Sequence, residues 1–222
     1  MTPPDNEALP RWAGITEPMT VLTNILLGGL AFVLAARLGL YSAAEGIRAS
    51  SLLSGALLTT AIAAILGAIA HGIDPRFDPA SRARMWRAAL YATGFVGAAT
   101  VASVAFFAAR ENIRTAILAF AALKLAMYMI NVARRPEFRV AAADYGGALA
   151  ILLVGAVYAS VRWRLAGAPW LIAGVAVSLV AGIVQARRVA PHRHFNHNDL
   201  FHVIQMVALY MFYRGGVMLV DR

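Results

Sequence analysis

Residues 52–73, LLSGALLTTAIAAILGAIAHGI, decide the fold class of this chain. The stretch contains no Asp, Glu, Lys or Arg, and its one strongly polar side chain, His71, comes at its end. A helix needs about 20 mostly apolar residues to cross the hydrocarbon core of a bilayer. This stretch therefore predicts a membrane-spanning helix.

The composition of the whole chain agrees with this prediction. Of its 222 residues, 60% are apolar and only 14% are charged, and the mean hydropathy is +0.67. An ordinary soluble domain is roughly 45–50% apolar and about 25% charged. The composition excludes a soluble enzyme and a disordered tail, and it indicates a protein embedded in a membrane.

Six further stretches are also long enough and mostly apolar. The seven expected spans are 18–40, 52–73, 86–109, 113–133, 140–161, 168–187 and 200–220. The gaps between them are short, and residues 1–17 form a short polar leader rather than a signal peptide with a basic start. We therefore expect an all-α fold: one domain over residues 1–222, built as an integral membrane bundle of seven transmembrane helices.

The net charge of +9 comes mainly from nineteen arginines, which lie mostly between the apolar stretches. This placement is typical of membrane-protein loops and differs from the basic stripe of a nucleic-acid-binding protein. Eleven arginines fall on the side of the N terminus and eight on the other side. The excess predicts a cytoplasmic N terminus.

The unusual polar residues are expected at one face of the bundle. In a seven-span topology, the start of span 18–40, the ends of spans 52–73, 113–133 and 168–187, and the starts of the other three all reach this face. The polar residues there include all five histidines of the chain: Glu17, Asn24, His71, Asp74, Asp78, Asn131, Asp144, Tyr145, His192, His194, Asn196, His197, Asn198, Asp199, His202 and Gln205. Imidazoles and carboxylates are costly at membrane depth, so their convergence indicates a functional cavity.

Histidine and carboxylate without cysteine is a ligand chemistry that suits zinc. We expect His71 and His202, with His197 or Asp199, as metal ligands, and Asp74 or Asp199 as the group that accepts and returns a proton. Two further sets of polar residues would line the same pocket: Glu17 and Asn24, seven residues apart, and Asn198 and Gln205, which share a helix face with His202.

Each of these residues also has a structural interpretation. His71 could bond a backbone carbonyl, Asp74 could belong to a turn, and Glu17 could interact with the dipole of the helix that follows it. The histidines near residue 195 could simply be solvated. Lys124 lies within span 113–133, where pairing with an acidic or amide side chain is the default expectation.

These features together resemble the alkaline ceramidase superfamily, which also includes the progestin and adipoQ receptors. The ceramidase pattern E-F-x-N-T-x-S-N is similar to EPMTVLTN at residues 17–24, and His71 and His202 match two of the family's three histidine ligands. Asn198 stands where the family has the first histidine of its H-x-x-x-H motif, and Gly67 stands where it has a serine. Asp5, Glu7 and Glu17 would form a reduced version of the family's acidic calcium-binding leader.

The resemblance implies a divergent bacterial-type member, placed in the inner (plasma) membrane. Its activity would be zinc-dependent hydrolysis of an amide or ester bond in a membrane lipid. The missing histidine at position 198 favours the alternative of a non-catalytic lipid receptor or sensor that uses the same polar pocket. Haem ligation by His71 and His202 is a weaker interpretation, as is a plain transporter.

Overall fold

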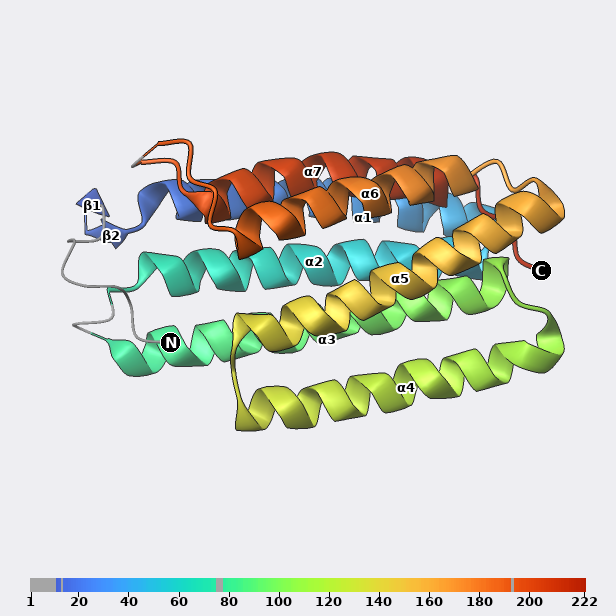
Figure 1. The fold of residues 1–222 in the computed structure, drawn as a ribbon, viewed down its shortest axis with the longest axis horizontal. Helices are drawn as coiled ribbons and strands as arrows, with labels where there is room; N and C mark the ends of the chain where they lie inside the picture. Colours follow the sequence, from blue (N-terminus) through green and yellow to red (C-terminus); the bar gives the residue numbers. More distant parts are fainter. Residues whose placement is uncertain (1–10, 13, 75–77, 193) are drawn as a thin grey trace.

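Seven α-helices and one short hairpin make up the structure, a computed structural model that describes residues 11–12, 14–74, 78–192 and 194–222 (Figure 1). The strands β1 (Arg11–Trp12) and β2 (Ile15–Thr16) pair antiparallel before the first helix. The helices are α1 Pro18–Glu45, α2 Arg48–Gly72, α3 Pro79–Phe107, α4 Glu111–Arg134, α5 Phe138–Trp163, α6 Ala168–Ala186 and α7 His197–Gly216. The predicted all-helical class and each of the seven predicted helices are confirmed.

Local sequence signals account for where several helices begin and end. Pro18 occupies the first turn of α1, where its missing N–H costs no hydrogen bond, and Gly46 ends α1 with a φ of 68° that favours glycine. Asp78 caps α3 by accepting a hydrogen bond from Ser81 N at 2.9 Å, and Pro79 follows it. This cap starts α3 at Pro79, seven residues before the apolar stretch begins at residue 86.

The helices run side by side along the bundle, but they are not evenly packed (Figure 1). α2 packs mainly against α1 and α3, α6 packs against α7, and α7 also packs against α1. Hydroxyl groups tie neighbouring helices together: Ser54 donates to the carbonyl of Ala35, and Ser103 to that of Ala49, each at 2.8 Å. α4 packs mainly against α3 and makes few contacts with α5. α5 crosses the bundle diagonally (Figure 1).

Six of the helices, α1 to α6, are long and apolar enough to cross a membrane. Their outer faces carry large apolar side chains that are mostly exposed, such as Leu40 on α1 and Val161 on α5. We conclude that the chain is an integral membrane protein. α7 has 20 residues but a more polar first half, in which Asp199, His202 and Gln205 are buried against the rest of the bundle.

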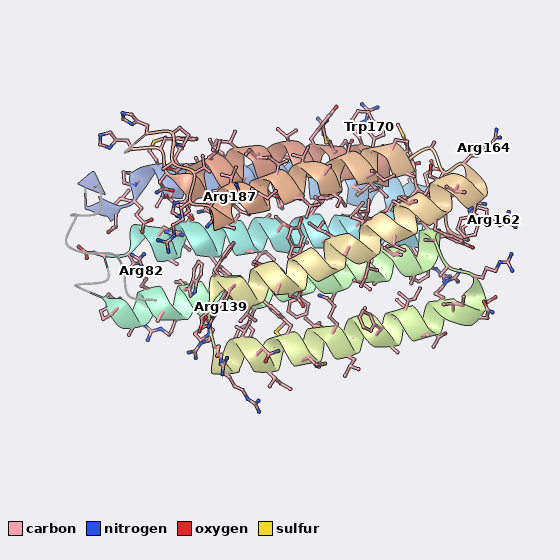
Figure 2. All side chains as sticks on the ribbon, viewed as in Figure 1. Arg82, Arg139, Arg162, Arg164, Trp170 and Arg187 are labelled. Atoms are coloured by element: carbon pink, nitrogen blue, oxygen red, sulfur yellow. The ribbon has the colours of Figure 1, made fainter. Side chains whose placement is uncertain are left out.

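The two ends of the bundle are rich in arginine. In Figure 2, Arg82, Arg139 and Arg187 lie toward one end, and Arg162 and Arg164 lie at the other, toward which Trp170 also lies. The first group belongs to the start of α3, the start of α5 and the end of α6, and the second group to the end of α5. The apolar part of the bundle lies between these two charged ends, as expected for helices that cross a bilayer.

Candidate functional site

A buried polar cluster joins α1 to α7 at the end of the bundle where α7 begins. Thr23 and Asn24 follow Thr20 by three and four residues, so they lie on its face of α1, and all three are buried. Asn24 Nδ2 donates to the carbonyl of Thr20 at 3.0 Å, and its Oδ1 lies against Gly67 of α2. A Cβ atom at Gly67 would come 3.3 Å from that oxygen, so the small residue lets the asparagine fit between the two helices.

Thr23 is the centre of this cluster. Its Oγ1 lies 2.9 Å from Nδ1 of His202, 3.4 Å from Oδ1 of Asp199 and 3.2 Å from the carbonyl of Thr20. His202 is 8% exposed and Asp199 is fully buried. The hydroxyl therefore links the imidazole and the carboxylate of α7 to the backbone of α1.

Asp199 also has a structural role at the start of α7. Its Oδ2 accepts a hydrogen bond from the backbone N–H of Asn196 at 2.8 Å, and the side chain of Asn196 accepts from the backbone N–H groups of Asn198 and Asp199. This is a capping box, in which the two side chains satisfy N–H groups that would otherwise have no partner at the helix start. Asp199 is predicted above as a proton acceptor or metal ligand, whereas the N-x-x-D capping pattern of residues 196–199 is not recognised there.

A second polar group lies closer to solvent. Glu17 precedes α1. Its carboxylate lies 3.0 Å from Nδ1 of His71 and accepts a hydrogen bond from a guanidinium nitrogen of Arg82, also at 3.0 Å. Burial alone would raise the pKa of Glu17, but the imidazole of His71 and the guanidinium of Arg82 outweigh this effect and hold the pKa below its ordinary value of 4.5. Glu17 thus joins the start of α1 to α2 and α3.

Gln205 connects α7 to two further helices. Its Nε2 donates to the hydroxyl of Tyr145 on α5 at 3.1 Å and to Ser178 Oγ on α6 at 3.2 Å. In the first turn of α7, Asn198 Oδ1 accepts a hydrogen bond from Gln185 Nε2 on α6 at 2.8 Å. Sequence reasoning misses Ser178 and Gln185, although their spacing of seven places them on one face of α6.

The zinc site expected from the sequence stays a prediction. Zinc needs three or four side chains directed at one centre, with Zn–N distances of about 2.0–2.1 Å. Among the residues that the structure describes, no group of three or more histidines and carboxylates is arranged to hold an ion. Nδ1 of His71 is bonded to Glu17, and Nδ1 of His202 to Thr23. These hydrogen bonds use one nitrogen of each ring, as the hydrogen bonds of metal-binding histidines also do, so His71, His197 and His202 stay predicted ligands.

Two other predicted residues lie at the ends of helices. Asp74 follows α2, and its backbone carbonyl accepts a hydrogen bond from Asp78 N at 3.1 Å. His197 is the first residue of α7. Of the predicted calcium-binding leader, Asp5 and Glu7 lie outside the described residues, and Glu17 is engaged by His71 and Arg82.

The one lysine of the chain marks a second polar site, between α4 and α5. Lys124 Nζ lies 2.6 Å from Asp144 Oδ1, and the two side chains are only 13% and 8% exposed. The predicted pairing of Lys124 with an acidic or amide group is confirmed. Asp144 Oδ2 is buried and accepts no hydrogen bond from the described residues. A Cβ atom at Gly97 of α3 would come 2.6 Å from this oxygen, so the pair sits directly against the backbone of α3.

This ion pair lines a groove of about 830 Å³ between α4 and α5. The groove is long and partly open, and its lining combines apolar and basic side chains: Phe120, Leu123, Lys124, Met127, Tyr128, Asn131, Arg134, Arg135, Arg139, Val140, Ala143 and Asp144. The weak packing between α4 and α5 explains its size. Nothing in the local sequence of either helix indicates a groove here, because it depends on the angle at which α5 crosses α4.

The fold and these two sites define an all-helical integral membrane protein with a polar cluster at one end and a groove on one side. Residues 19–221 match a family of unknown function, DUF6962. Because the match spans nearly the whole chain, the protein belongs to this family. No curated protein and no solved structure matches the chain. The resemblance to the ceramidase superfamily therefore stays a prediction.

Proposed function

We propose that this protein is a non-catalytic receptor or sensor that binds an amphiphilic lipid within the membrane. The observation that carries the proposal is the groove of about 830 Å³ between α4 and α5. Small-molecule sites usually have volumes of about 300–1,000 Å³, with mostly apolar walls and a few polar groups. This groove has such walls, and the Lys124–Asp144 pair supplies polar groups within them.

The polar cluster at the start of α7 supports binding rather than hydrolysis. Its members bond mainly to one another: Thr23 to His202 and Asp199, and Asp199 to the N-cap of α7. Buried polar groups that satisfy each other in this way hold helices together. A metal hydrolase would need three ligands directed at one ion and an open position for water. The cluster is better suited to positioning α7.

A chain of contacts connects the groove to α7 and supports a sensing role. Asp144 lines the groove, and the next residue, Tyr145, has its hydroxyl bonded to Gln205 of α7. Gln205 is three residues from His202, which is bonded to α1. A ligand that shifts the first turns of α5 would therefore act on the helix that carries the polar cluster.

In this proposal, α7 is a seventh membrane span. A helix of 20 residues is about 30 Å long, which matches the hydrocarbon core. α7 lies alongside α1 and α6, and its polar residues Asp199, His202 and Gln205 are buried in the bundle rather than directed at lipid. With seven spans, the hairpin before α1 and the C terminus lie on opposite sides of the membrane.

The test is retention of lipid by the purified full-length protein, measured by native mass spectrometry in mild detergent. Ala143→Trp fills the groove, and Ala142→Trp places the same side chain on the neighbouring exposed position, which does not line it. We expect a co-purified lipid in the parent and in Ala142→Trp, and its loss in Ala143→Trp.

Elemental analysis and an absorption spectrum of the same sample test the alternatives. Stoichiometric zinc that disappears in His202→Ala, together with hydrolysis of a lipid amide, would overturn the proposal in favour of the hydrolase. A haem spectrum that disappears in His202→Ala would overturn it in favour of haem ligation. Lipid retained equally by Ala143→Trp would show that the groove is not the binding site.

A further inference from the structure

The charges around the groove are unbalanced at one end. The Lys124–Asp144 pair is neutral as a unit, and Arg139 is paired with Glu137. Arg134 and Arg135, at the end of α4, also line the groove, and no ion pair joins either of them to another described residue. Both side chains are exposed. The groove therefore has two guanidinium groups at its rim whose charge is not compensated within the described protein.

The wall that α4 contributes is a continuous stripe. Phe120, Leu123, Met127 and Arg134 follow one another at helical spacing, with apolar groups at one end and the basic group at the other. Arg134 follows Phe120 by 14 residues, which corresponds to about 21 Å along the helix axis. This is a long apolar surface that ends in positive charge.

The depth of each group follows from the same geometry. With Arg134 at the edge of the hydrocarbon core, Lys124 lies about 15 Å deeper, near the middle of a core about 30 Å thick. The ion pair there adds no net charge. A charged headgroup therefore has its complement at the arginine rim and not beside Lys124.

We propose that the groove binds an anionic phospholipid, with its phosphate held by Arg134 and Arg135 and an acyl chain along the Phe120–Met127 stripe. This inference rests on the proposed function and names the class of ligand. Guanidinium groups bind phosphate through paired, charge-assisted hydrogen bonds. An anionic headgroup leaves the two positive charges balanced, whereas a zwitterionic headgroup adds its own cation beside them.

A second copy of the chain is a poorer occupant. In a membrane, two copies with the same orientation bring equivalent residues to the same depth. A symmetric contact through this groove would place Arg134 and Arg135 of one copy near those of the other, and like charges at an interface are unfavourable. A phospholipid brings the opposite charge.

The experiment uses the absence of cysteine from the chain, which allows a single fluorophore to be attached at a chosen position. Met127→Cys places the label in the groove, seven residues from Arg134. Ile25→Cys is the control, on an exposed position of α1 seven residues from the start of that helix at the same end of the bundle. In bilayers of phosphatidylcholine and phosphatidylglycerol with identical chains, brominated versions of each lipid quench the label, and the quenching gives their relative binding constants.

We expect the quenching of the groove label in Met127→Cys to show preferential binding of phosphatidylglycerol. The control label in Ile25→Cys should show no such preference. Replacing Arg134 and Arg135 with glutamine should lower the preference for phosphatidylglycerol about 30-fold, because the variant loses the attraction of two arginines for an anionic headgroup. The matched control, Arg162→Gln with Arg164→Gln, removes two exposed arginines from the opposite end and should leave it unchanged.

Three results would overturn the inference, and they separate it from the proposed function. Equal quenching of the groove label by both lipids, with lipid retained by the parent protein, would leave the receptor and remove the anionic preference. An unchanged preference after the Arg134 and Arg135 substitutions would place the headgroup elsewhere. Disulfide cross-linking between two copies of the unlabelled Met127→Cys variant, without lipid quenching of the labelled one, would assign the groove to a dimer contact and overturn both proposals.

Discussion

Breaking the Lys124–Asp144 pair should destabilise the protein more than removing both of its charges. The perturbation is Lys124→Met, which keeps a long, flexible side chain and removes only the ammonium group. Asp144 is 8% exposed, and its second oxygen already lacks a hydrogen-bond donor among the described residues. The variant therefore leaves a buried carboxylate with no partner on either oxygen.

The expected cost follows from the burial of the pair. Removing one partner of a buried ion pair costs about 3–5 kcal/mol, because the remaining charge stays out of water without compensation. Asp144→Asn should cost a similar amount, since it isolates the lysine. The double variant, Lys124→Met with Asp144→Asn, has no charge at this site. It leaves only the asparagine amide short of hydrogen-bond partners, at a cost of about 1–3 kcal/mol.

The assay is thermal unfolding of the purified protein in one detergent, followed by circular dichroism. For a chain of this length, about 2–4 °C corresponds to each kcal/mol, so each single variant should unfold about 6–20 °C lower. Glu137→Gln is the matched control because it breaks a pair with Arg139 that is largely exposed. Exposed pairs contribute about 0–1 kcal/mol, so this control should differ little from the parent.

The reasoning is refuted by either of two results. One is a shift for Lys124→Met no larger than that for Glu137→Gln. The other is a double variant whose loss equals the sum of the two single losses, since uncoupled groups give additive effects.

Three further predictions use the same unfolding measurement. Thr23→Val removes the hydroxyl that bonds a buried imidazole and should cost about 1–3 kcal/mol, whereas Thr59→Val, whose hydroxyl bonds only carbonyls of its own helix, should cost less; equal losses would contradict this. The lowered pKa of Glu17 means that its contribution to stability is complete above its ordinary value of 4.5 and is lost as the pH falls below it. Glu17→Gln should be less stable at neutral pH and should lose this acid dependence, and an unchanged profile would show that its contacts contribute nothing. Gly97→Ala should destabilise the protein because its Cβ would contact the Lys–Asp pair, whereas Gly55→Ala, with open space around its Cβ, should be neutral or slightly stabilising.

The placement of α7 in the membrane is open to a separate test. A reporter fused to the C terminus should be found on the side of the membrane opposite to one fused before α1. Both reporters on the same side would mean an even number of spans, with α7 lying outside the hydrocarbon core.

Sequence reasoning predicted the helices well because the requirement for each one is local. About 20 apolar residues without charge need a hydrogen-bonded helix in lipid, wherever the rest of the chain lies. The main differences are at the ends, as at α3, which begins at Pro79 because Asp78 caps it. α7 differed in composition. Its polar residues lower its mean hydropathy, but packing within the bundle buries them.

The polar sites could be predicted only in part. The sequence placed Glu17, His71 and His202 at one end of the bundle, because the order of antiparallel spans determines which helix ends meet. It could not predict that His71 bonds Glu17 while His202 bonds Thr23. The hydrogen-bond partners depend on how each helix is rotated about its axis. The length of an apolar stretch does not predict this rotation.

The sequence by itself determined that this chain is a helical membrane protein, where its helices lie, and that its lysine needs a buried partner. Only the tertiary structure decided that the partner is Asp144, that α5 crosses α4 at an angle that leaves a groove, and that the histidines bond to different groups. The physical reason is that burial in lipid acts on each helix separately, whereas a site depends on how helices far apart in the sequence cross and rotate against one another.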